Sequence, residues 1–217
     1  MSGPHQGQPV QAAGVPLDQA RALVILVHGR GGSAADILGL ARELMLDDVA
    51  FLAPQASGST WYPYSFLAPI ENNEPGLSSG LATIEKISQD AVTAGIPSER
   101  QMVLGFSQGA CLTLEFAARH PRRYGGIVGF TGGLVGPPGT PRDYPGSFDG
   151  TPFFIGSSDP DPHVPWERVE ETAQVVEGMG GKVDLRRYPG MPHTINAEEI
   201  EAATKMLEDI VDSSGKS

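Results

Sequence analysis

The amino-acid sequence predicts an α/β protein in which one mostly parallel, doubly wound sheet lies between two layers of helices. Short apolar runs alternate with longer segments whose apolar residues recur at helical spacing, and no segment is repeated. The 28 glycines and 19 prolines fall between these runs, as expected for tight loops that join regular elements. Alternating strands and helices are typical of a parallel sheet, because each helix returns the chain to the same edge of the sheet.

The length of 217 residues suits one hydrophobic core and is short for two ordinary domains. We therefore expect a single domain over residues 17–217. Residues 1–16 are rich in Gly, Pro and Gln, which predicts a mobile tail without a function and, at most, a short edge strand at 10–12.

The first half of the expected domain begins with a strand over 22–27, where every residue is apolar, as in a strand that is covered on both faces. Ser33 is expected to cap a helix over 33–46, with Asp36 in its first turn. A second buried strand follows at 49–53. Residues 54–76 combine prolines with aromatic residues and are too irregular for a regular element, so they predict a loop that packs on the domain.

The second half begins with a helix over 78–94, which ends before the Gly-Ile-Pro sequence at 95–97. One face of this helix carries the residues Leu81, Ile84, Ile87, Ser88 and Ala91. The later elements are expected, in order, as strand 101–106, helix 108–119, strand 125–131, an irregular stretch over 132–150, strand 152–156, helix 165–178, strand 182–188 and helix 196–212.

The net charge of −11 argues against nucleic acid as a partner, since no Lys/Arg cluster is present in the sequence to neutralise phosphates. Residues 1–14 lack the basic and apolar segments of a secretory signal, and no stretch approaches the roughly 18 apolar residues of a membrane span. The sequence thus predicts a cytoplasmic protein with no stable membrane insertion. Its single cysteine, Cys111, has no partner for an internal disulfide, which fits a reducing compartment.

The sequence Gly105-Phe106-Ser107-Gln108-Gly109 lies where a predicted strand meets a predicted helix. In a nucleophile elbow, a serine occupies a strained turn that pushes its hydroxyl into a cleft, and the flanking glycines let the strand and the helix approach each other. The pattern alone also fits a glycine-rich turn with an ordinary serine N-cap. Its position at the strand end favours Ser107 as a nucleophile.

A serine hydroxyl is a poor nucleophile until a base removes its proton, so this hypothesis requires a histidine and a carboxylate that orients it. The histidines are His5 in the tail, His28 at a strand end before the serine, His120 after a helix, His163 in an acidic loop, and His193. His193 follows the last predicted strand, and ligands of open α/β sheets gather at the carboxyl ends of the strands. We therefore expect His193 to be the base.

The carboxylate is expected in the loop after the strand at 152–156, which gives the chain order Ser, Asp, His of this type of site. Asp159 and Asp161 both qualify by position. Either one also suits a turn in which the aspartate side chain bonds its own backbone, so the pattern leaves both open.

Several motifs in this order resemble the carboxylesterase and acyl-protein thioesterase family, also called the phospholipase/carboxylesterase family, of the α/β-hydrolase superfamily. They are His28-Gly29-Arg30-Gly31-Gly32, Gly105-Phe106-Ser107-Gln108-Gly109, Asp161-Pro162-His163-Val164-Pro165 and Gly190-Met191-Pro192-His193. The resemblance covers residues 22 to about 210 and implies an α/β-hydrolase fold with Asp161 as the triad acid. The turn between Gly156 and Asp161 is longer than in the family, which leaves Asp159 as an alternative.

By the same resemblance, the backbone N–H groups of Arg30 and Gln108 form the oxyanion hole. Two preformed donors aimed at the tetrahedral oxygen contribute several kcal/mol to catalysis. The guanidinium of Arg30 is, in addition, a candidate contact for an anionic group of a substrate.

Neither a metal nor a cofactor is expected. No His/Cys/Asp/Glu cluster in the sequence has metal-ligand spacing, and Gly29-x-Gly31-Gly32 is not a dinucleotide fingerprint. Cys111 lies on the helix after Ser107 and is expected to be an unreactive core residue.

Trp61 and Tyr62 are candidate substrate-binding residues, together with Tyr64 and Phe66, and the polar run at 71–74 offers further contacts. The alternative is that these aromatic side chains fill the core beneath a long loop.

The sequence therefore predicts a serine carboxylesterase that cleaves short to medium acyl esters through an acyl-serine intermediate, with a small-molecule ester or thioester as substrate. An acyl-thioesterase or a lysophospholipase uses the same triad with a different pocket, and the sequence does not separate these activities. A third alternative is a non-catalytic binding protein of the same fold. Monomer and homodimer both remain open.

Overall fold

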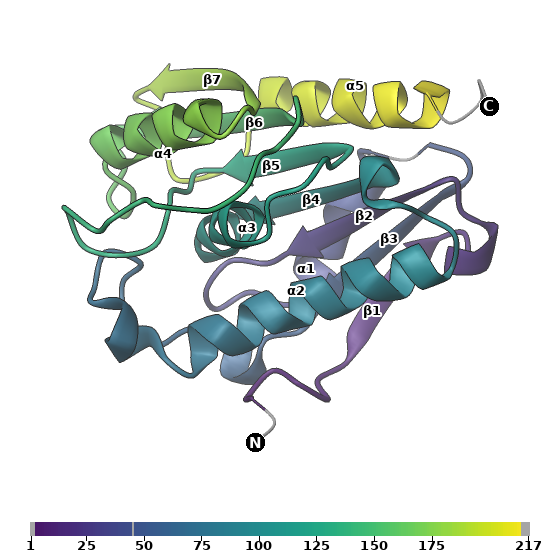
Figure 1. The fold of residues 1–217 in the computed structure, drawn as a ribbon, viewed down its shortest axis with the longest axis horizontal. Coiled ribbons are helices and arrows are strands. Elements are labelled where there is room, and N and C mark those ends of the chain that lie inside the picture. Colours follow the sequence, from purple (N-terminus) through teal and green to yellow (C-terminus); the bar gives the residue numbers. More distant parts are fainter. Residues whose placement is uncertain (1–2, 45, 214–217) are drawn as a thin grey trace.

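The computed structural model describes residues 3–44 and 46–213, which form one seven-stranded sheet with helices on both faces (Figure 1). The strands are β1 (Val10–Gly14), β2 (Ala22–Val27), β3 (Val49–Pro54), β4 (Gln101–Phe106), β5 (Gly126–Phe130), β6 (Pro152–Asp159) and β7 (Lys182–Pro189). Their order is β1-β3-β2-β4-β5-β6-β7, and only the pair of β1 and β3 is antiparallel. The predicted fold class, α/β with a mostly parallel doubly wound sheet, is confirmed.

The α-helices cover the sheet in two layers. They are α1 (Ala34–Leu38), α2 (Gly76–Thr93), α3 (Gln108–Arg119), α4 (Trp166–Gly178) and α5 (Ala197–Ser213), and short 3₁₀ helices lie at Leu17–Gln19, Gly39–Arg42, Ser57–Ser59, Ile70–Asn73 and Ser98–Arg100. Helices α2, α3 and α4 pack on one face and α1 and α5 on the other. Successive residues of a strand face opposite sides, so Leu23 joins the first layer and Val24 the second. Both sides of β2 are therefore buried, which explains its uniformly apolar sequence.

Two elements differ from their predicted ends by three residues or more. Strand β6 continues past residue 156 to Asp159, because it pairs with β7 up to the partners Asp159 and Pro189. The helix expected over 33–46 is wrong beyond Leu38, where the chain turns into a 3₁₀ helix that begins at Gly39, a residue that weakens α-helices. The expected cap is present, since the N–H of Asp36 donates to Ser33 Oγ at 3.2 Å. Residue 45 of this prediction lies outside the described residues.

Residues 3–16 pack on the domain, unlike the mobile tail expected for residues 1–16. Strand β1 pairs with β3 over residues 10–14 and is therefore longer than the edge strand expected at 10–12. The His5 ring is 3% exposed, accepts the N–H of Ser57 at Nδ1 (3.1 Å) and donates from Nε2 to the carbonyl of Trp61 (2.8 Å). Composition does not predict this contact. It depends on one histidine side chain that forms hydrogen bonds with two backbone groups, which an apolar side chain could not do. Residues 1, 2 and 214–217 lie outside the described residues.

His5 is expected to stabilise the fold more strongly at pH 8 than at pH 5. Burial is the main cause that lowers the pKa of the ring below its usual value, and a protonated Nδ1 would repel the N–H of Ser57. As the pH falls, the His5 ring thus binds a proton in the unfolded chain before it does so in the folded protein. The contribution of His5 to the free energy of unfolding is therefore complete above about pH 6.5, and it decreases as the pH falls toward the pKa of His5 in the folded protein. The free energy of unfolding of His5→Ala, compared with wild type across this range, checks the prediction. A difference of about 1–2 kcal/mol that does not change with pH would contradict it.

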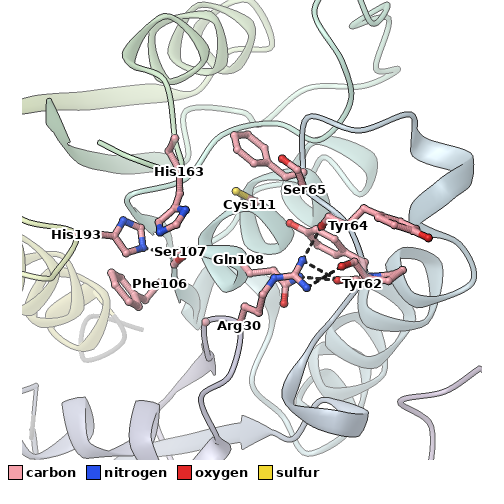
Figure 2. Close-up of a pocket in the computed structure, with 14 residues that line it drawn as sticks. Arg30, Tyr62, Tyr64, Ser65, Phe106, Ser107, Gln108, Cys111, His163 and His193 are labelled. Carbon is pink, nitrogen blue, oxygen red and sulfur yellow. Dashed lines mark hydrogen bonds between the residues drawn. The ribbon is translucent and has the colours of Figure 1, made fainter. Parts of the chain in front are cut away.

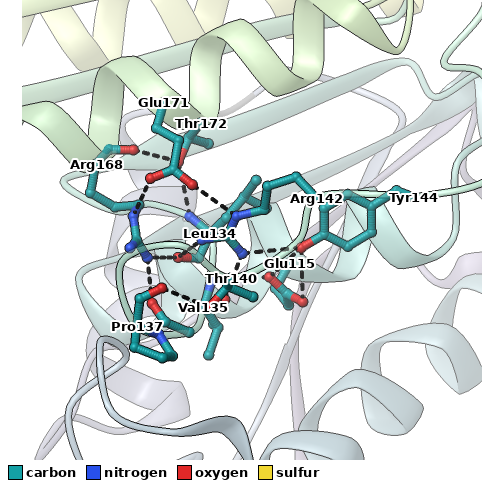
Figure 3. A network of polar contacts seen from close by, with 11 residues as sticks. Glu115, Leu134, Val135, Pro137, Thr140, Arg142, Tyr144, Arg168, Glu171 and Thr172 are labelled. Atoms are coloured by element: carbon teal, nitrogen blue, oxygen red, sulfur yellow. Dashed lines mark hydrogen bonds and ion pairs between the residues drawn. The ribbon is translucent and has the colours of Figure 1, made fainter.

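The irregular segment expected at 132–150 is ordered by a polar network beneath α4 (Figure 3). Arg168 is 4% exposed and donates to the carbonyls of Leu134 and Gly136, each at 2.7 Å. Glu171 accepts from both Arg168 and Arg142, each at 2.9 Å. The network places this segment beside residues 54–76, the aromatic loop, where the N–H of Gly136 donates to the carbonyl of Phe66.

None of the helices formed by the described residues is long and apolar enough to cross a membrane.

Candidate active site

Three polar side chains meet where β4, β6 and β7 end. Ser107 directly follows β4, Asp161 lies in the turn after β6, and His193 lies in the turn after β7. The Nε2 atom of His193 lies 2.9 Å from Ser107 Oγ, and its Nδ1 atom lies 2.8 Å from Asp161 Oδ2. The carboxyl ends of parallel strands meet at one edge of the sheet, which is why residues so far apart in the sequence come together.

Ser107 lies in a strained turn between β4 and α3. Its backbone has φ 55° and ψ −119°, a region that residues with a side chain rarely adopt. The glycines of the motif are required by close packing: a Cβ atom at Gly105 would clash with the backbone of Gly109, and one at Gly109 would clash with the carbonyl of Val27. The backbone geometry is that of a nucleophile elbow.

Asp161 is enclosed by hydrogen-bond donors. Its side chain is fully buried and accepts from Ser158 Oγ at 2.6 Å and from the N–H groups of His163 and Val164, each at 2.9 Å. Burial alone would raise the pKa of Asp161, but the bonds from Ser158, His193 and the two N–H groups outweigh it and hold the pKa below its usual value. The carboxylate is therefore charged at neutral pH.

The alternative acid, Asp159, points to a different partner. As the last residue of β6, it forms an ion pair with the guanidinium of Arg187, whose Nε donates to it at 2.7 Å. The structure therefore brings Asp161, and not Asp159, to His193. Because a charged Asp161 accepts the proton on Nδ1, neutral His193 presents Nε2 as an acceptor to the Ser107 hydroxyl. This arrangement is suited to removing the serine proton.

The backbone N–H groups of Arg30 and Gln108 are available to a ligand beside Ser107. Both residues line the same pocket as Ser107 and His193 (Figure 2). Gln108 is the first residue of α3, where a backbone N–H has no partner within the helix. Across the described residues, no hydrogen bond is donated by either of these N–H groups to another protein atom. Two such donors next to a nucleophile can stabilise an oxyanion.

The side chains of Arg30 and Gln108 hold the aromatic loop in place. The Arg30 guanidinium donates to three successive carbonyls at 62–64, over 2.9, 2.9 and 2.6 Å. The Gln108 amide accepts from the N–H of Trp61 at 2.9 Å and donates to the carbonyl of Tyr62 at 2.8 Å. The sequence did not reveal these bonds, because every residue has a backbone carbonyl and no pattern marks the ones that are used.

The pocket above Ser107 has a volume of about 420 Å³. Its lining residues are Gly29, Arg30, Tyr62, Pro63, Tyr64, Ser65, Phe66, Phe106, Ser107, Gln108, Cys111, His163, Val164 and His193. Of the expected aromatic contacts, Tyr62, Tyr64 and Phe66 line it, whereas the run at 71–74 does not. Trp61 is fully buried beneath the loop and donates from Nε1 to the carbonyl of His28 at 2.9 Å, so its place in the structure is that of a core residue.

Cys111 lies at the floor of the pocket and is 1% exposed. Burial raises the pKa of its thiol to about 12, so the group is a neutral thiol at physiological pH and a poor nucleophile. In the part of the chain that the structure describes, no group of three or more His, Cys, Asp or Glu side chains is arranged to hold a metal ion.

Glu199, which is not among the sequence-predicted site residues, fixes the end of the loop that carries His193. Its N–H donates to Asn196 Oδ1 at 3.0 Å, and its carboxylate accepts the N–H of Asn196 at 2.9 Å. This reciprocal pair is a capping box at the start of α5, and the Asn-x-x-Glu spacing at 196–199 was the available signal. Glu199 is fully buried, and burial raises its pKa to about 7.

Replacing Glu199 with alanine is expected to lower kcat about tenfold with little change in KM. Loss of the capping box costs about 1 kcal/mol and loosens the loop that places His193, and a small displacement of a catalytic base reduces the rate of the chemical step. Glu199→Gln keeps both hydrogen bonds and is expected to retain most of kcat. Steady-state kinetics on a chromogenic ester compare the two variants. Equal losses in both, or an effect confined to KM, would contradict this role.

The chain is similar to known proteins over nearly its whole length. A model of the phospholipase/carboxylesterase family matches residues 10–211. An acyl-protein thioesterase 1 from Yarrowia lipolytica is 26% identical over 93% of this chain and 97% of its own length. A probable carboxylesterase, SOBER1-like, from Arabidopsis thaliana is 24% identical over 91% of this chain and 82% of its own length.

Solved structures show the same architecture. The crystal structure of a phospholipase/carboxylesterase from Dyadobacter fermentans superimposes with a TM-score of 0.89, is 46% identical, and covers 93% of this chain and 97% of its own. The Bacillus cereus carboxylesterase has a TM-score of 0.76 at 18% identity, over 94% of this chain and 95% of its own, which supports the fold alone.

Proposed function

The chain belongs to the phospholipase/carboxylesterase family and is a hydrolase of carboxylic esters or thioesters, and we propose that it works through a triad of Ser107, His193 and Asp161. The observation that carries this proposal is the unbroken pair of hydrogen bonds from Ser107 through His193 to Asp161. A serine with an oriented base is the arrangement needed for nucleophilic catalysis.

In the proposed acylation step, Ser107 Oγ attacks the carbonyl carbon while His193 Nε2 takes the hydroxyl proton. The N–H groups of Arg30 and Gln108 donate hydrogen bonds to the carbonyl oxygen as negative charge develops on it, and Asp161 stabilises the imidazolium. The tetrahedral intermediate then collapses to an acyl-serine, and His193 gives the proton to the departing alcohol or thiol.

Deacylation uses the same residues. Water takes the place of the leaving group, and His193 removes its proton as the oxygen attacks the acyl-serine carbonyl. The second tetrahedral intermediate expels Ser107 Oγ, which recovers its proton from His193. The proton that Ser107 lost to the leaving group is thus replaced by one from water, so the enzyme returns to its starting state and the net reaction is hydrolysis of one ester bond.

We propose short to medium acyl esters as the preferred substrates. The pocket of about 420 Å³ is bounded by the aromatic loop and by a floor of buried side chains at Tyr62 and Cys111. This volume suits a small ligand. A long acyl chain would have to extend out of the pocket and would gain little from burial.

A panel of chromogenic esters from acetate and butyrate to octanoate and palmitate, with matching thioesters, tests the preference. The highest kcat/KM is expected for the short oxygen esters. A clear preference for palmitoyl thioesters would favour the acyl-thioesterase alternative, and turnover of lysophospholipids above all esters would favour the lysophospholipase. Tight ligand binding without turnover of any substrate would indicate the non-catalytic alternative.

We also propose a cytoplasmic location, for which the supporting observations are the acidic sequence and the single cysteine. A measurement of molecular mass in solution distinguishes a monomer from a homodimer.

A further inference from the structure

We propose that the pocket above Ser107 selects esters that carry a negatively charged group, such as a carboxylate, on their acyl part. This inference rests on the hydrolase function proposed above and names a substrate class for the same site. The features that carry it are the charges that line the pocket and the way in which Arg30 is held there.

The described lining of the pocket contains no carboxylate. It contains one permanent cation, Arg30, and two imidazoles, His163 and His193. This composition is unusual in a chain with 26 acidic and 15 basic residues, whose net charge of −11 would repel anions from most of its surface. The acid of the proposed triad, Asp161, lies behind His193 with a fully buried side chain. The negative charge of Asp161 is already stabilised by hydrogen bonds from four donors.

Arg30 carries a positive charge that no carboxylate neutralises among the described residues. Its three recorded hydrogen bonds all go to carbonyl oxygens, at 62–64. Of the thirteen other described Lys and Arg residues, seven are paired with carboxylates: Lys86, Arg119, Arg122, Arg142, Arg168, Arg186 and Arg187. A guanidinium has five N–H donors, so three bonds leave two donors for a ligand. The positive charge of Arg30 is thus fixed at the pocket wall and open to an anion.

The position of Arg30 relative to the reacting serine indicates which part of the substrate it meets. Ser107 lies between His193 and His163 on one side and Gln108 and Arg30 on the other (Figure 2). The leaving group must depart toward His193, which supplies its proton. The carbonyl oxygen points to the N–H groups of Arg30 and Gln108, and the acyl part takes the remaining direction, away from His193. The Arg30 guanidinium, held against the carbonyls at 62–64, can there meet a carboxylate at the far end of the acyl chain.

His163 adds a hydrogen-bonding side chain to the opposite wall. Its ring lies edge-on to His193, with ring centroids 5.0 Å apart, and it lines the pocket. An imidazole there is polar without bringing a negative charge near the substrate. Both walls therefore accept an anionic substrate without like-charge repulsion, and a partly screened attraction to Arg30 is expected to favour it by about tenfold.

Two matched substrates measure this preference: 4-nitrophenyl hexanoate and the mono-4-nitrophenyl ester of adipic acid, whose six-carbon acyl chain ends in a carboxylate instead of a methyl group. The quantity compared is the ratio of their kcat/KM values, after subtraction of spontaneous hydrolysis. Arg30→Gln removes the charge of residue 30, whereas Arg30→Lys keeps it, and both lose the bonds to the loop. Arg42→Gln removes an exposed cation remote from the pocket.

The ratio of adipate to hexanoate is expected to fall about tenfold in Arg30→Gln, to stay within about threefold of wild type in Arg30→Lys, and to be unchanged in Arg42→Gln. In wild type alone, the ratio is expected to decrease as sodium chloride is raised, because salt screens the attraction. A ratio that is equal in wild type and Arg30→Gln, or independent of salt in wild type, overturns this inference while hexanoate turnover by Ser107 stands. Failure of wild type to hydrolyse either ester overturns the proposed function and this inference with it.

Discussion

Replacing Ser107 with alanine is expected to lower kcat for ester hydrolysis by on the order of 10⁴- to 10⁶-fold while the protein remains folded. The alanine side chain has no atom that can form the acyl intermediate. The fold does not depend on the hydroxyl, because the Ser107 side chain makes no capping bond to α3. The N–H groups of Arg30 and Gln108 remain in the variant and account for a small residual rate.

The measurement is kcat on 4-nitrophenyl butyrate for wild type and Ser107→Ala, with circular dichroism and thermal unfolding as controls for folding. A folded variant that kept a tenth or more of the wild-type kcat would mean that another group is the nucleophile. Cys111 is a poor candidate for that role, because burial raises its pKa to about 12.

Replacing Asp161 with asparagine is expected to lower kcat about 10⁴-fold, the loss seen when the orienting carboxylate of a triad is removed. The amide no longer stabilises the imidazolium, and it favours the tautomer of His193 that carries the proton on Nε2. That tautomer cannot accept the proton of Ser107. Asp161 also orders the turn after β6 through the N–H groups of His163 and Val164, and one amide oxygen can still accept them.

Asp159→Asn is the matched control, since it makes the same chemical change two positions earlier in the chain. Asp159 is paired with Arg187 at the surface, where an ion pair contributes little, so its substitution is expected to change kcat less than threefold. The two variants are compared with wild type on the same ester. A larger loss in Asp159→Asn than in Asp161→Asn would exclude the proposed role of Asp161.

The sequence predicted the fold well, because the strands of a doubly wound sheet are buried on both faces and therefore stand out as apolar runs. The elbow at Ser107 and the position of His193 after the last strand follow from the same strand order. The choice between Asp159 and Asp161 depended on where β6 ends, and pairing with β7 carries that strand to Asp159. Strand ends are set by pairing partners, which a local pattern does not contain.

The features that sequence patterns missed are contacts between a side chain and a backbone group. His5 binds the backbone at residues 57 and 61, and Arg30 binds three carbonyls. Since every residue has a backbone N–H or carbonyl, nothing in the sequence marks the partner. Trp61 shows the opposite case, in which an aromatic residue near the site proved to be fully buried beneath it. The capping role of Glu199 could have been predicted from its spacing with Asn196, which is that of a capping box.

Reaction with a fluorophosphonate, followed by mass spectrometry of the peptides, tests most directly whether Ser107 is the nucleophile. We predict that the mass of one phosphonyl group appears on the peptide that contains Ser107, in step with the loss of esterase activity, and that Ser107→Ala takes up no label. Loss of activity with the label on a different residue, or full activity in a protein whose Ser107 is completely labelled, would contradict the proposed mechanism.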